Sequence, residues 1–435
     1  MIKNTLKENV TQEKTDIYYS YLQILNEELI PAMGCTEPIS LAYAAAKAYK
    51  ILGERPDKID VVVSGNIIKN VKSVVVPNTN GLKGIKAAVA AGIISGRDDK
   101  VLEVLADLSE KQKLQIVEYL KNTNISISVA DNDLNFDIFL TLFKGKSYAK
   151  LRIIDDHTNV VLIEKNGEVL YTPEDCNSHV IHNNNKSLLC MENIFKFANI
   201  VDINDVKELI SKQIQYNVSI AEEGLNGNYG ANVGRTLLTM YGNDVKTRAK
   251  ALAAAGSDAR MSGCEMPVMI VCGSGNQGLA VSVPVVEYAK EYNVDSETLY
   301  RALVLSNLIA VYLKAGIGSL SAFCGAVCAG CASGAAIAYL LGGDLVAVST
   351  TVSNALAIVS GIVCDGAKAS CAAKIASSVE AGILGYNMYL NENKFFPGDG
   401  ILGTDIESTV KNIWRLGKNG MKQTDEEILK IMTDN

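Results

Sequence analysis

The segment from Ser321 to Lys374 most constrains the fold, because five of the chain's ten cysteines lie there in an otherwise apolar, Ala/Gly-rich background. Three of these thiols stand in short motifs: Cys324 in SAFCG, Cys364 in IVCDGAK and Cys371 in SCAAK. The intervals between them are 39 and then six residues. Thiolates gathered in a protein without disulfides usually bind zinc, copper(I) or an iron–sulfur cluster, because sulfur is a soft ligand.

Cys328 and Cys331 extend the pattern to C-x3-C-x2-C, counted from Cys324. If residues 322–340 are helical, these three thiols share one stripe, and the outer two lie roughly 10 Å apart along the axis. That distance is too long for one cluster unless the helix breaks. Cysteines packing as small hydrophobes between Ala/Gly-rich helices are the simpler interpretation of Cys328 and Cys331.

The pair Asp365-Gly366 follows Cys364 directly and is typical of a turn. Such a turn can fold the chain back and bring Cys364 and Cys371 toward one point. Core packing stays an alternative for these two thiols and for Cys324, but a ligand role is favoured.

Cys35 is expected at the start of a helix. Apolar residues at helical spacing predict a first helix over residues 15–30, and the run ISLAYAAAKAYKIL predicts a second, with Thr36 or Glu37 as its N-cap and Pro38 in its first turn. Free N–H groups and the helix dipole favour a thiolate there, so we expect a lowered pKa for Cys35. A buried loop cysteine is the alternative.

Length and charge limit the function classes. With 435 residues, two domains sharing an interface are expected. A net charge of −7 argues against nucleic-acid and anionic-membrane partners and favours a small-molecule substrate. The polar N-terminus MIKNTLKENVTQEKTD lacks the apolar stretch of a signal peptide, so we expect a cytoplasmic protein with reduced thiols.

The predicted fold class is α+β, with an α+β domain over residues 1–200 that carries Cys35 and a mostly helical, Ala/Gly-rich, cluster-binding domain over 201–435. Helices are predicted in the first half near 83–95 and 100–121. Short apolar or β-branched runs predict strands there at 59–64, 71–76, 125–130, 138–143, 148–154 and 159–163.

The segment 170–190 contains Cys176, His179 and His182, which suggests a metal site. Its asparagine-rich surroundings favour a surface loop instead.

The second half is expected to be helical, broken by glycine-rich joints at 225–234 and at GSGNQG, 273–278, and to end in a polar amphipathic helix over 405–430. Backbone N–H groups at such joints bind carboxylates or phosphates. We therefore expect Ser274 and Asn276 to bind substrate, with a helix-packing loop as the alternative.

Four motifs together resemble the L-cysteine desulfidases and the related alpha region of iron–sulfur L-serine dehydratases. They are PAMGCTEP at 31–38, GSGNQG, SAFCG and IVCDGAKASCAAK, in the family's order and spacing over nearly the whole chain. IVCDGAKASC is specific, whereas GSGNQG alone is weak. The resemblance implies a 4Fe-4S cluster bound by Cys324, Cys364 and Cys371, with one iron free for substrate, and Cys35 as the catalytic base.

Several alternatives stay open. The runs 266–286, 315–343 and 345–364 are long enough to span a membrane, but they are rich in Gly, Ser, Ala and Asn and lack aromatic belts and basic flanks. The C-x3-C-x2-C run suggests a radical S-adenosylmethionine enzyme, although it lies late in the chain. A purely structural or binding protein would leave the spaced cysteines unexplained.

A pyridoxal-phosphate enzyme is the more serious alternative. SGNQG resembles a carboxylate-binding loop of one such class, and Lys246 lies 30 residues before Asn276, near where that class has its Schiff-base lysine. The glycine run for the cofactor phosphate and the alternating strands of a parallel βα fold are missing.

The sequence thus predicts a lyase that eliminates the β-substituent of a small L-amino acid. L-Cysteine, giving sulfide, ammonia and pyruvate, is the expected substrate, L-serine is the close alternative, and a homodimer is compatible with the sequence. The free iron would act as a Lewis acid while a base removes the α-proton. The histidines His157, His179 and His182 lie away from every motif, so Cys35 is the expected base.

Overall fold

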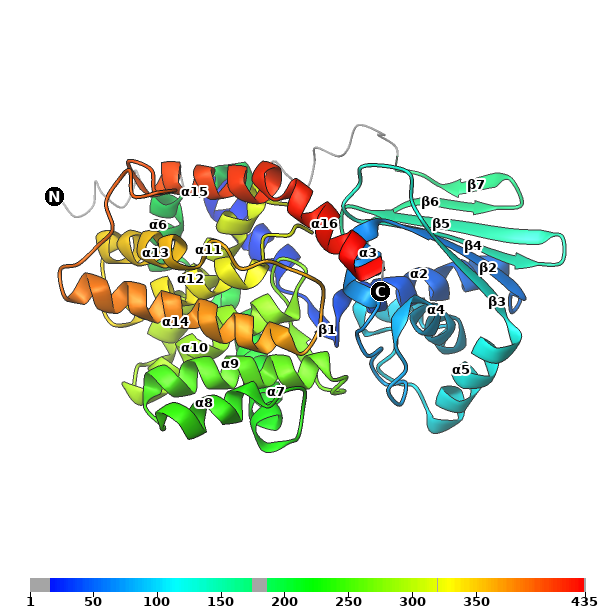
Figure 1. The fold of residues 1–435 in the computed structure, drawn as a ribbon, viewed down its shortest axis with the longest axis horizontal. Helices are drawn as coiled ribbons and strands as arrows, with labels where there is room; N and C mark the ends of the chain where they lie inside the picture. Colours follow the sequence, from blue (N-terminus) through cyan, green and yellow to red (C-terminus); the bar gives the residue numbers. More distant parts are fainter. Residues whose placement is uncertain (1–15, 174–185, 319, 434–435) are drawn as a thin grey trace.

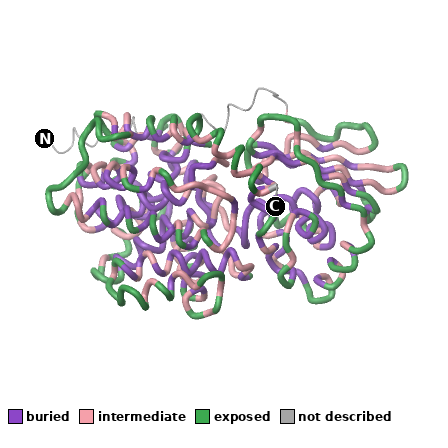
Figure 2. Tube along the Cα trace, viewed as in Figure 1, coloured by how far each residue is buried: buried purple, intermediate pink, exposed green. Residues whose placement is uncertain are grey.

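The computed structural model describes residues 16–173, 186–318 and 320–433. Helix accounts for about 61% and strand for 12%, and the helices dominate the second half of the chain, which confirms the predicted α+β class. Figure 1 shows the sheet with its helices on one side of the molecule and a helical body on the other. Figure 2 shows buried backbone running through the middle of both halves.

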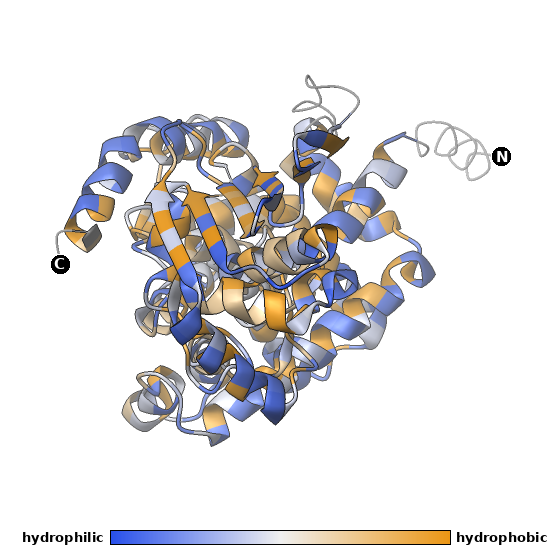
Figure 3. Ribbon diagram, turned by 90° about the vertical axis from the view of Figure 1, so that its right-hand side faces the viewer, coloured by the Kyte–Doolittle hydropathy of each residue, from blue (hydrophilic) through white to orange (hydrophobic). Residues whose placement is uncertain are grey.

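The larger sheet has the order β3-β2-β4-β5-β6-β7, in which β2 and β3 are parallel and all other neighbours are antiparallel. Side chains alternate along its strands: in β4, Ile138, Leu140 and Leu142 are buried and the residues between them are half-buried. Figure 3 shows the same alternation as hydropathy. The strands are β2 (Lys58–Val63), β3 (Asn124–Val129), β4 (Asp137–Lys144), β5 (Ser147–Ile154), β6 (Val160–Lys165) and β7 (Glu168–Tyr171).

Helices cover the apolar face of this sheet. Helix α2 packs on β4 and β5, α4 packs behind α2, and α5 packs on α4. The helices of this half are α2 (Thr36–Leu52), α3 (Gly65–Val71), α4 (Gly84–Ser95), the 3-10 helix η1 (Asp98–Glu103) and α5 (Glu110–Asn122).

Two predictions for this half were wrong, and one strand was missed. The strand expected at 71–76 is an irregular segment after α3, with only an isolated bridge from Val75 to Lys83, because a short buried apolar run need not find a strand partner. The helix expected over 100–121 is interrupted, and Ser109 starts α5 through a capping box with Gln112. Strand β7 was not predicted.

The helical body is built around α12, which contacts α10, α11, α13 and α14. Close contacts between small residues fix its packing on α14: a methyl group added at Gly334 would lie 2.5 Å from the backbone of Gly382. The helices here are α6 (Met191–Ile200), α7 (Ile203–Asn226), α8 (Val233–Tyr241), α9 (Val245–Met261), α10 (Gly275–Glu291), α11 (Ser296–Ala315), α12 (Gly325–Leu340), α13 (Leu345–Val359) and α14 (Ser370–Leu390).

Three segments join the two halves. Residues 16–28 form a helix whose Tyr21 packs on Phe197 of α6. Strand β1 (Pro31–Met33) pairs with β8 (Pro267–Met269). The last helix returns to the first half, and the buried Lys69 of α3 forms an ion pair with Asp425 there. These segments cross the domain boundary expected near residue 200. The boundary itself stays a prediction.

The C-terminal region contains two helices and a π-helical turn where one helix over 405–430 was expected. They are α15 (Ile406–Arg415), η4 (Leu416–Gly420) and α16 (Lys422–Thr433). Within the ranges that the structure describes, no helix has the length and hydropathy to cross a membrane.

We expect Gly334→Ala to lower the free energy of unfolding by about 1–3 kcal/mol, because the added methyl group forces α12 and α14 apart. This penalty exceeds the gain of about 1 kcal/mol in helix propensity from glycine to alanine. Thermal and urea denaturation would measure it. Gly361→Ala is the matched control, because a methyl group there has no atom within 4 Å. Equal stability of the two variants would contradict the close packing.

Candidate functional site

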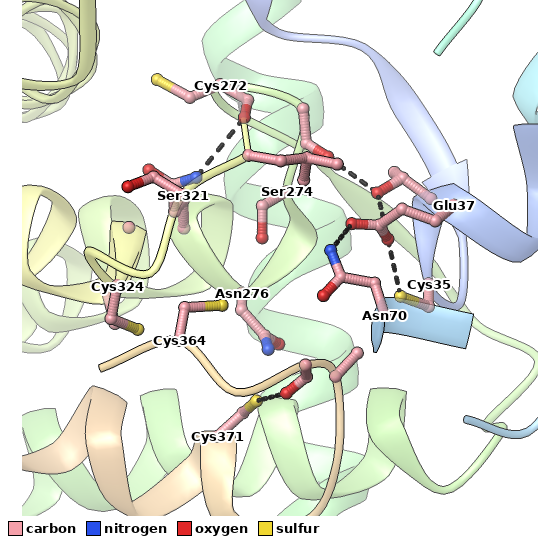
Figure 4. A pocket seen from close by; sticks show the side chains of 18 of the residues that line it. Cys35, Glu37, Asn70, Cys272, Ser274, Asn276, Ser321, Cys324, Cys364 and Cys371 are labelled. Carbon is pink, nitrogen blue, oxygen red and sulfur yellow. Dashed lines mark hydrogen bonds between the residues drawn. The ribbon is translucent and has the colours of Figure 1, made fainter. Parts of the chain in front are cut away.

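A cavity of about 100 Å³ lies where the two halves meet, and residues of all four sequence motifs line it. The structure places every predicted site residue on its wall: Cys35, Ser274, Asn276, Cys324, Cys364 and Cys371. In Figure 4, Cys324 and Cys364 lie together, Cys371 lies below them, and Cys35 and Glu37 lie on the other side of Asn276.

Four α-helices begin at this wall, namely α2, α10, α12 and α14. Cys35 and Cys324 are themselves the N-cap residues of α2 and α12. The first N–H groups of a helix have no partner within it, and the helix dipole is positive at that end. The cavity is therefore suited to negative charge.

Backbone pairing brings the first two motifs together. Strand β1 ends at Met33, two residues before Cys35, and its partner β8 ends shortly before the GSGNQG loop. The Thr36 hydroxyl then donates a hydrogen bond to the Gly273 carbonyl at 2.8 Å. Motifs more than 230 residues apart thus form one wall.

A second backbone pairing places Cys324 beside Cys364. Phe323 and Val363 form an antiparallel bridge, the Cys324 N–H donates to the Ile362 carbonyl at 3.1 Å, and the Cys364 N–H donates to Ala322. Because Cys324 precedes α12, the helical spacing from it to Cys331 no longer applies. Cys328 and Cys331 lie inside α12, fully buried and away from the cavity lining.

The loop between Cys364 and Cys371 turns at Gly366, whose φ of +94° is accessible to few residues other than glycine. A methyl group there would also lie 2.4 Å from the Lys69 carbonyl. The Lys374 ammonium group stabilises the loop: it donates hydrogen bonds to the Asp365 carboxylate and, at 2.8 Å, to the Val363 carbonyl. The turn expected at Asp365-Gly366 is present.

The pKa values of the three thiols are shifted in different directions. A hydrogen bond from Cys324 lowers the pKa of Cys364 to about 6, and the ammonium groups of Lys69 and Lys314 contribute to that lowering. The same hydrogen bond raises the pKa of Cys324, and burial raises that of Cys371. Cys364 is thus the thiol of this group that most readily becomes a thiolate.

The donor set suits a soft metal centre. Across the described ranges, no three His, Cys, Asp or Glu side chains are already near enough to one another to hold one metal ion. The three thiols nevertheless line one cavity, with lysines beside them that balance thiolate charge. Three sulfur donors in a cationic setting fit an iron–sulfur cluster better than a hard cation.

The expected lowering of the Cys35 pKa was wrong. Burial, and next the charge of Glu37, raise it well above its usual value, and the Cys35 thiol donates a hydrogen bond to Glu37 Oε2 at 3.0 Å. The pKa of Glu37 is lowered overall. Burial acts to raise it, but nearby His157 and this hydrogen bond outweigh burial. The proton therefore rests on sulfur, despite the helix terminus.

Sequence reasoning missed several residues that line the cavity. His157, expected to lie far from the motifs, is buried there, with its ring against Gly273. Asn70 donates to Glu37 Oε1 at 2.8 Å, and Arg260 donates to Asn276 Oδ1 at 3.1 Å. No local pattern marks them, because their positions depend on how distant segments pair.

The cavity wall also contains buried polar atoms without a hydrogen-bond partner in the protein. They are Asn70 Oδ1, His157 Nε2, Arg260 Nε and Gln277 Oε1. Unsatisfied buried groups are costly, so their concentration here indicates a site built for a polar ligand.

Two alternative sites lose support or fall outside the description. Lys246, the residue expected to form a Schiff base in a pyridoxal enzyme, is exposed on α9 and is absent from the cavity lining. Cys176, His179 and His182 lie outside the described residues.

Comparisons with known proteins agree with the motifs. The family model described as serine dehydratase alpha chain matches residues 99–430. A UPF0597 protein of Desulfitobacterium hafniense is 60% identical over 421 residues, which is 97% of this chain and 98% of the relative. UPF0597 proteins of Lachnoclostridium phytofermentans (48% identical, 96% of this chain and 100% of the relative) and Fusobacterium nucleatum (45% identical, 95% and 98%) also match.

We expect Glu37→Gln to lower the pKa of Cys35, because the neutral amide no longer repels the thiolate. At a fixed pH near 8, Cys35 should then react faster with iodoacetamide. Peptide mass spectrometry over a pH series would give its apparent pKa. Glu192→Gln, at an exposed position of α6, is the control. An unchanged or raised pKa in Glu37→Gln would show that this carboxylate does not govern the thiol.

Proposed function

Since the chain belongs to the serine dehydratase alpha chain family, we propose that it is a lyase that eliminates the β-substituent of a small L-amino acid. L-Cysteine is the proposed substrate, and sulfide, ammonia and pyruvate are the proposed products. One observation carries this proposal: Cys324, Cys364 and Cys371 line the same cavity as Cys35.

The proposed cofactor is a 4Fe-4S cluster held by Cys324, Cys364 and Cys371. When bound, its free iron supplies a Lewis acid for the departing β-substituent. Lys69 and Lys314 would offset the negative charge of the thiolates. The backbone bridge between Phe323 and Val363 holds two of the three ligands in register.

Cys35 is the proposed base for the α-proton. Its thiol must first pass its own proton to Glu37, which already accepts a hydrogen bond from it. A raised pKa makes the thiolate rarer but makes each thiolate a stronger base, which suits a carbon acid as weak as an amino-acid α-carbon. Asn70 holds Glu37 in position to take the proton.

Ser274 and Asn276, at the start of α10, are the proposed substrate-binding residues. The first N–H groups of that helix face the cavity and favour a carboxylate. The aminoacrylate released by elimination would tautomerise to an imine, and water would convert it to pyruvate and ammonia.

L-Serine is the second candidate, because the matching family is described as serine dehydratase. Loss of hydroxide requires the same geometry as loss of sulfide. Assays of pyruvate from both amino acids, with sulfide from L-cysteine, on protein purified without oxygen would decide between them. Failure to form pyruvate from either would overturn the proposed function.

We expect Cys324→Ser, Cys364→Ser and Cys371→Ser each to lose most of the iron and the broad visible absorbance of a cluster, because serine replaces a soft thiolate by a hard hydroxyl. Iron and acid-labile sulfide analysis after anaerobic purification would measure this. Cys328→Ser and Cys331→Ser are the controls and should keep their iron. Loss of iron in Cys328→Ser and Cys331→Ser, with full iron in the other three variants, would place the ligands in α12.

We expect Cys35→Ala to keep its iron and its affinity for substrate while turnover falls at least about 100-fold, because only the proton transfer is removed. Exchange of the substrate α-proton in deuterium oxide, followed by NMR, would report that step directly. Exchange at the normal rate would remove Cys35 from the base role. Loss of the cluster would make Cys35 a ligand instead.

A further inference from the structure

We propose that Arg260 binds the α-carboxylate of the substrate through its guanidinium group. This inference rests on the proposed function only in taking an amino acid as the ligand. It assigns the carboxylate, which the sequence analysis placed on the GSGNQG loop with Ser274 and Asn276, to a charged partner as well.

Arg260 is held firmly at the cavity wall. It lies in the last turn of α9, its exposed fraction is 2%, and its Nη1 donates to Asn276 Oδ1 at 3.1 Å. Its side chain packs so closely on Gly275, the first residue of α10, that a methyl group there would lie 2.3 Å from Nε. The guanidinium group therefore sits where α10 begins.

The guanidinium group of Arg260 makes no direct ion pair within the described part of the chain. Among the described residues, none of the ion pairs within 4.0 Å includes it, and its Nε has no hydrogen-bond acceptor. A guanidinium group has five N–H donors, and a buried cation without a counter-ion is costly. Such a residue is best explained by an anion that arrives from solution.

The two buried lysines of the cavity act on its other groups. Lys69 pairs with Asp425 of α16, and the charge of Lys314 helps to lower the pKa of Cys364. Arg260 instead acts on Cys35 and Glu37 through its charge. Arg260 thus lies close enough to the proposed base to act on it through its charge.

A carboxylate matches this place in shape and charge. The planar fork of arginine binds a carboxylate through two parallel hydrogen bonds, and the first N–H groups of α10 add further donors. A substrate held there would direct its α-carbon toward Cys35 and its β-substituent toward the three thiols. Because α-proton removal moves negative charge into the carboxylate, the contact should strengthen in the transition state.

Binding of a non-reacting pair tests this inference without turnover. L-Alanine and L-alaninamide differ only in the carboxylate, and isothermal titration calorimetry on the anaerobic holoenzyme would compare their affinities. The wild type should prefer L-alanine. Arg260→Gln should bind L-alanine about 10- to 100-fold more weakly and should bind the amide within about threefold of the wild type, because one charge-assisted contact is lost.

Two further variants make the result decisive. Arg260→Lys keeps the charge but loses the planar pair of N–H donors, so its preference for L-alanine should be intermediate. This variant replaces Arg260→Gln in the test if Arg260→Gln does not fold. Arg248→Gln, on the same helix but paired with Glu291 at the surface, is the control and should keep the full preference.

Two outcomes would overturn the inference: a wild type that binds both ligands equally, or Arg260 variants that keep the full preference for L-alanine. If the wild type prefers L-alanine through Arg260 yet forms no pyruvate from L-cysteine or L-serine, the carboxylate site stands and the proposed reaction fails.

Discussion

The structure depends on stabilising negative charge inside one cavity. Thiolates and a carboxylate buried in a medium of low dielectric are costly unless matched by positive charge or hydrogen-bond donors. The protein matches them with the beginnings of four helices and with buried cations, among them Arg260, whose Nε has no hydrogen-bond acceptor. The arrangement requires helices from both halves of the chain to converge on one point.

That convergence explains the Ala/Gly bias of the segment around Cys324. Helices begin at a common wall only if their first turns approach closely, and Gly325 allows this where α12 meets Gln277 of α10. Gly330 and Gly334 then let α12 lie directly on α14, which carries Cys371. Cys328 is a small buried residue of the same helix. The Ala/Gly-rich composition and the position of the thiol site therefore both follow from the close approach of these helices.

Local pattern predicted much of this molecule, and distant pairing accounts for what it missed. Runs of apolar and β-branched residues predicted β4 and β5, and the residue types of Asp365-Gly366 predicted the turn at Gly366. The site was predictable as motifs, but His157 and Arg260 lie outside them and reach the cavity through the tertiary packing of distant segments. The helix start, expected with Thr36 or Glu37 as the N-cap, lies at Cys35, one or two residues earlier. The pKa of Cys35 was not predicted, because burial, and next the charge of Glu37, raise it despite the helix terminus.

The proposed carboxylate site and the proposed base are coupled through charge. Arg260 now acts to lower the pKa of Cys35, against burial and Glu37, which raise it. A carboxylate bound to Arg260 would cancel much of that positive charge, and the thiolate of Cys35 would become a stronger base when the substrate is in place. The same carboxylate makes the thiolate harder to form, so Glu37 is needed to take the proton. Arg260 and Glu37 thus have opposite effects on the pKa of Cys35, and the proposed binding of a carboxylate to Arg260 would shift the balance between them.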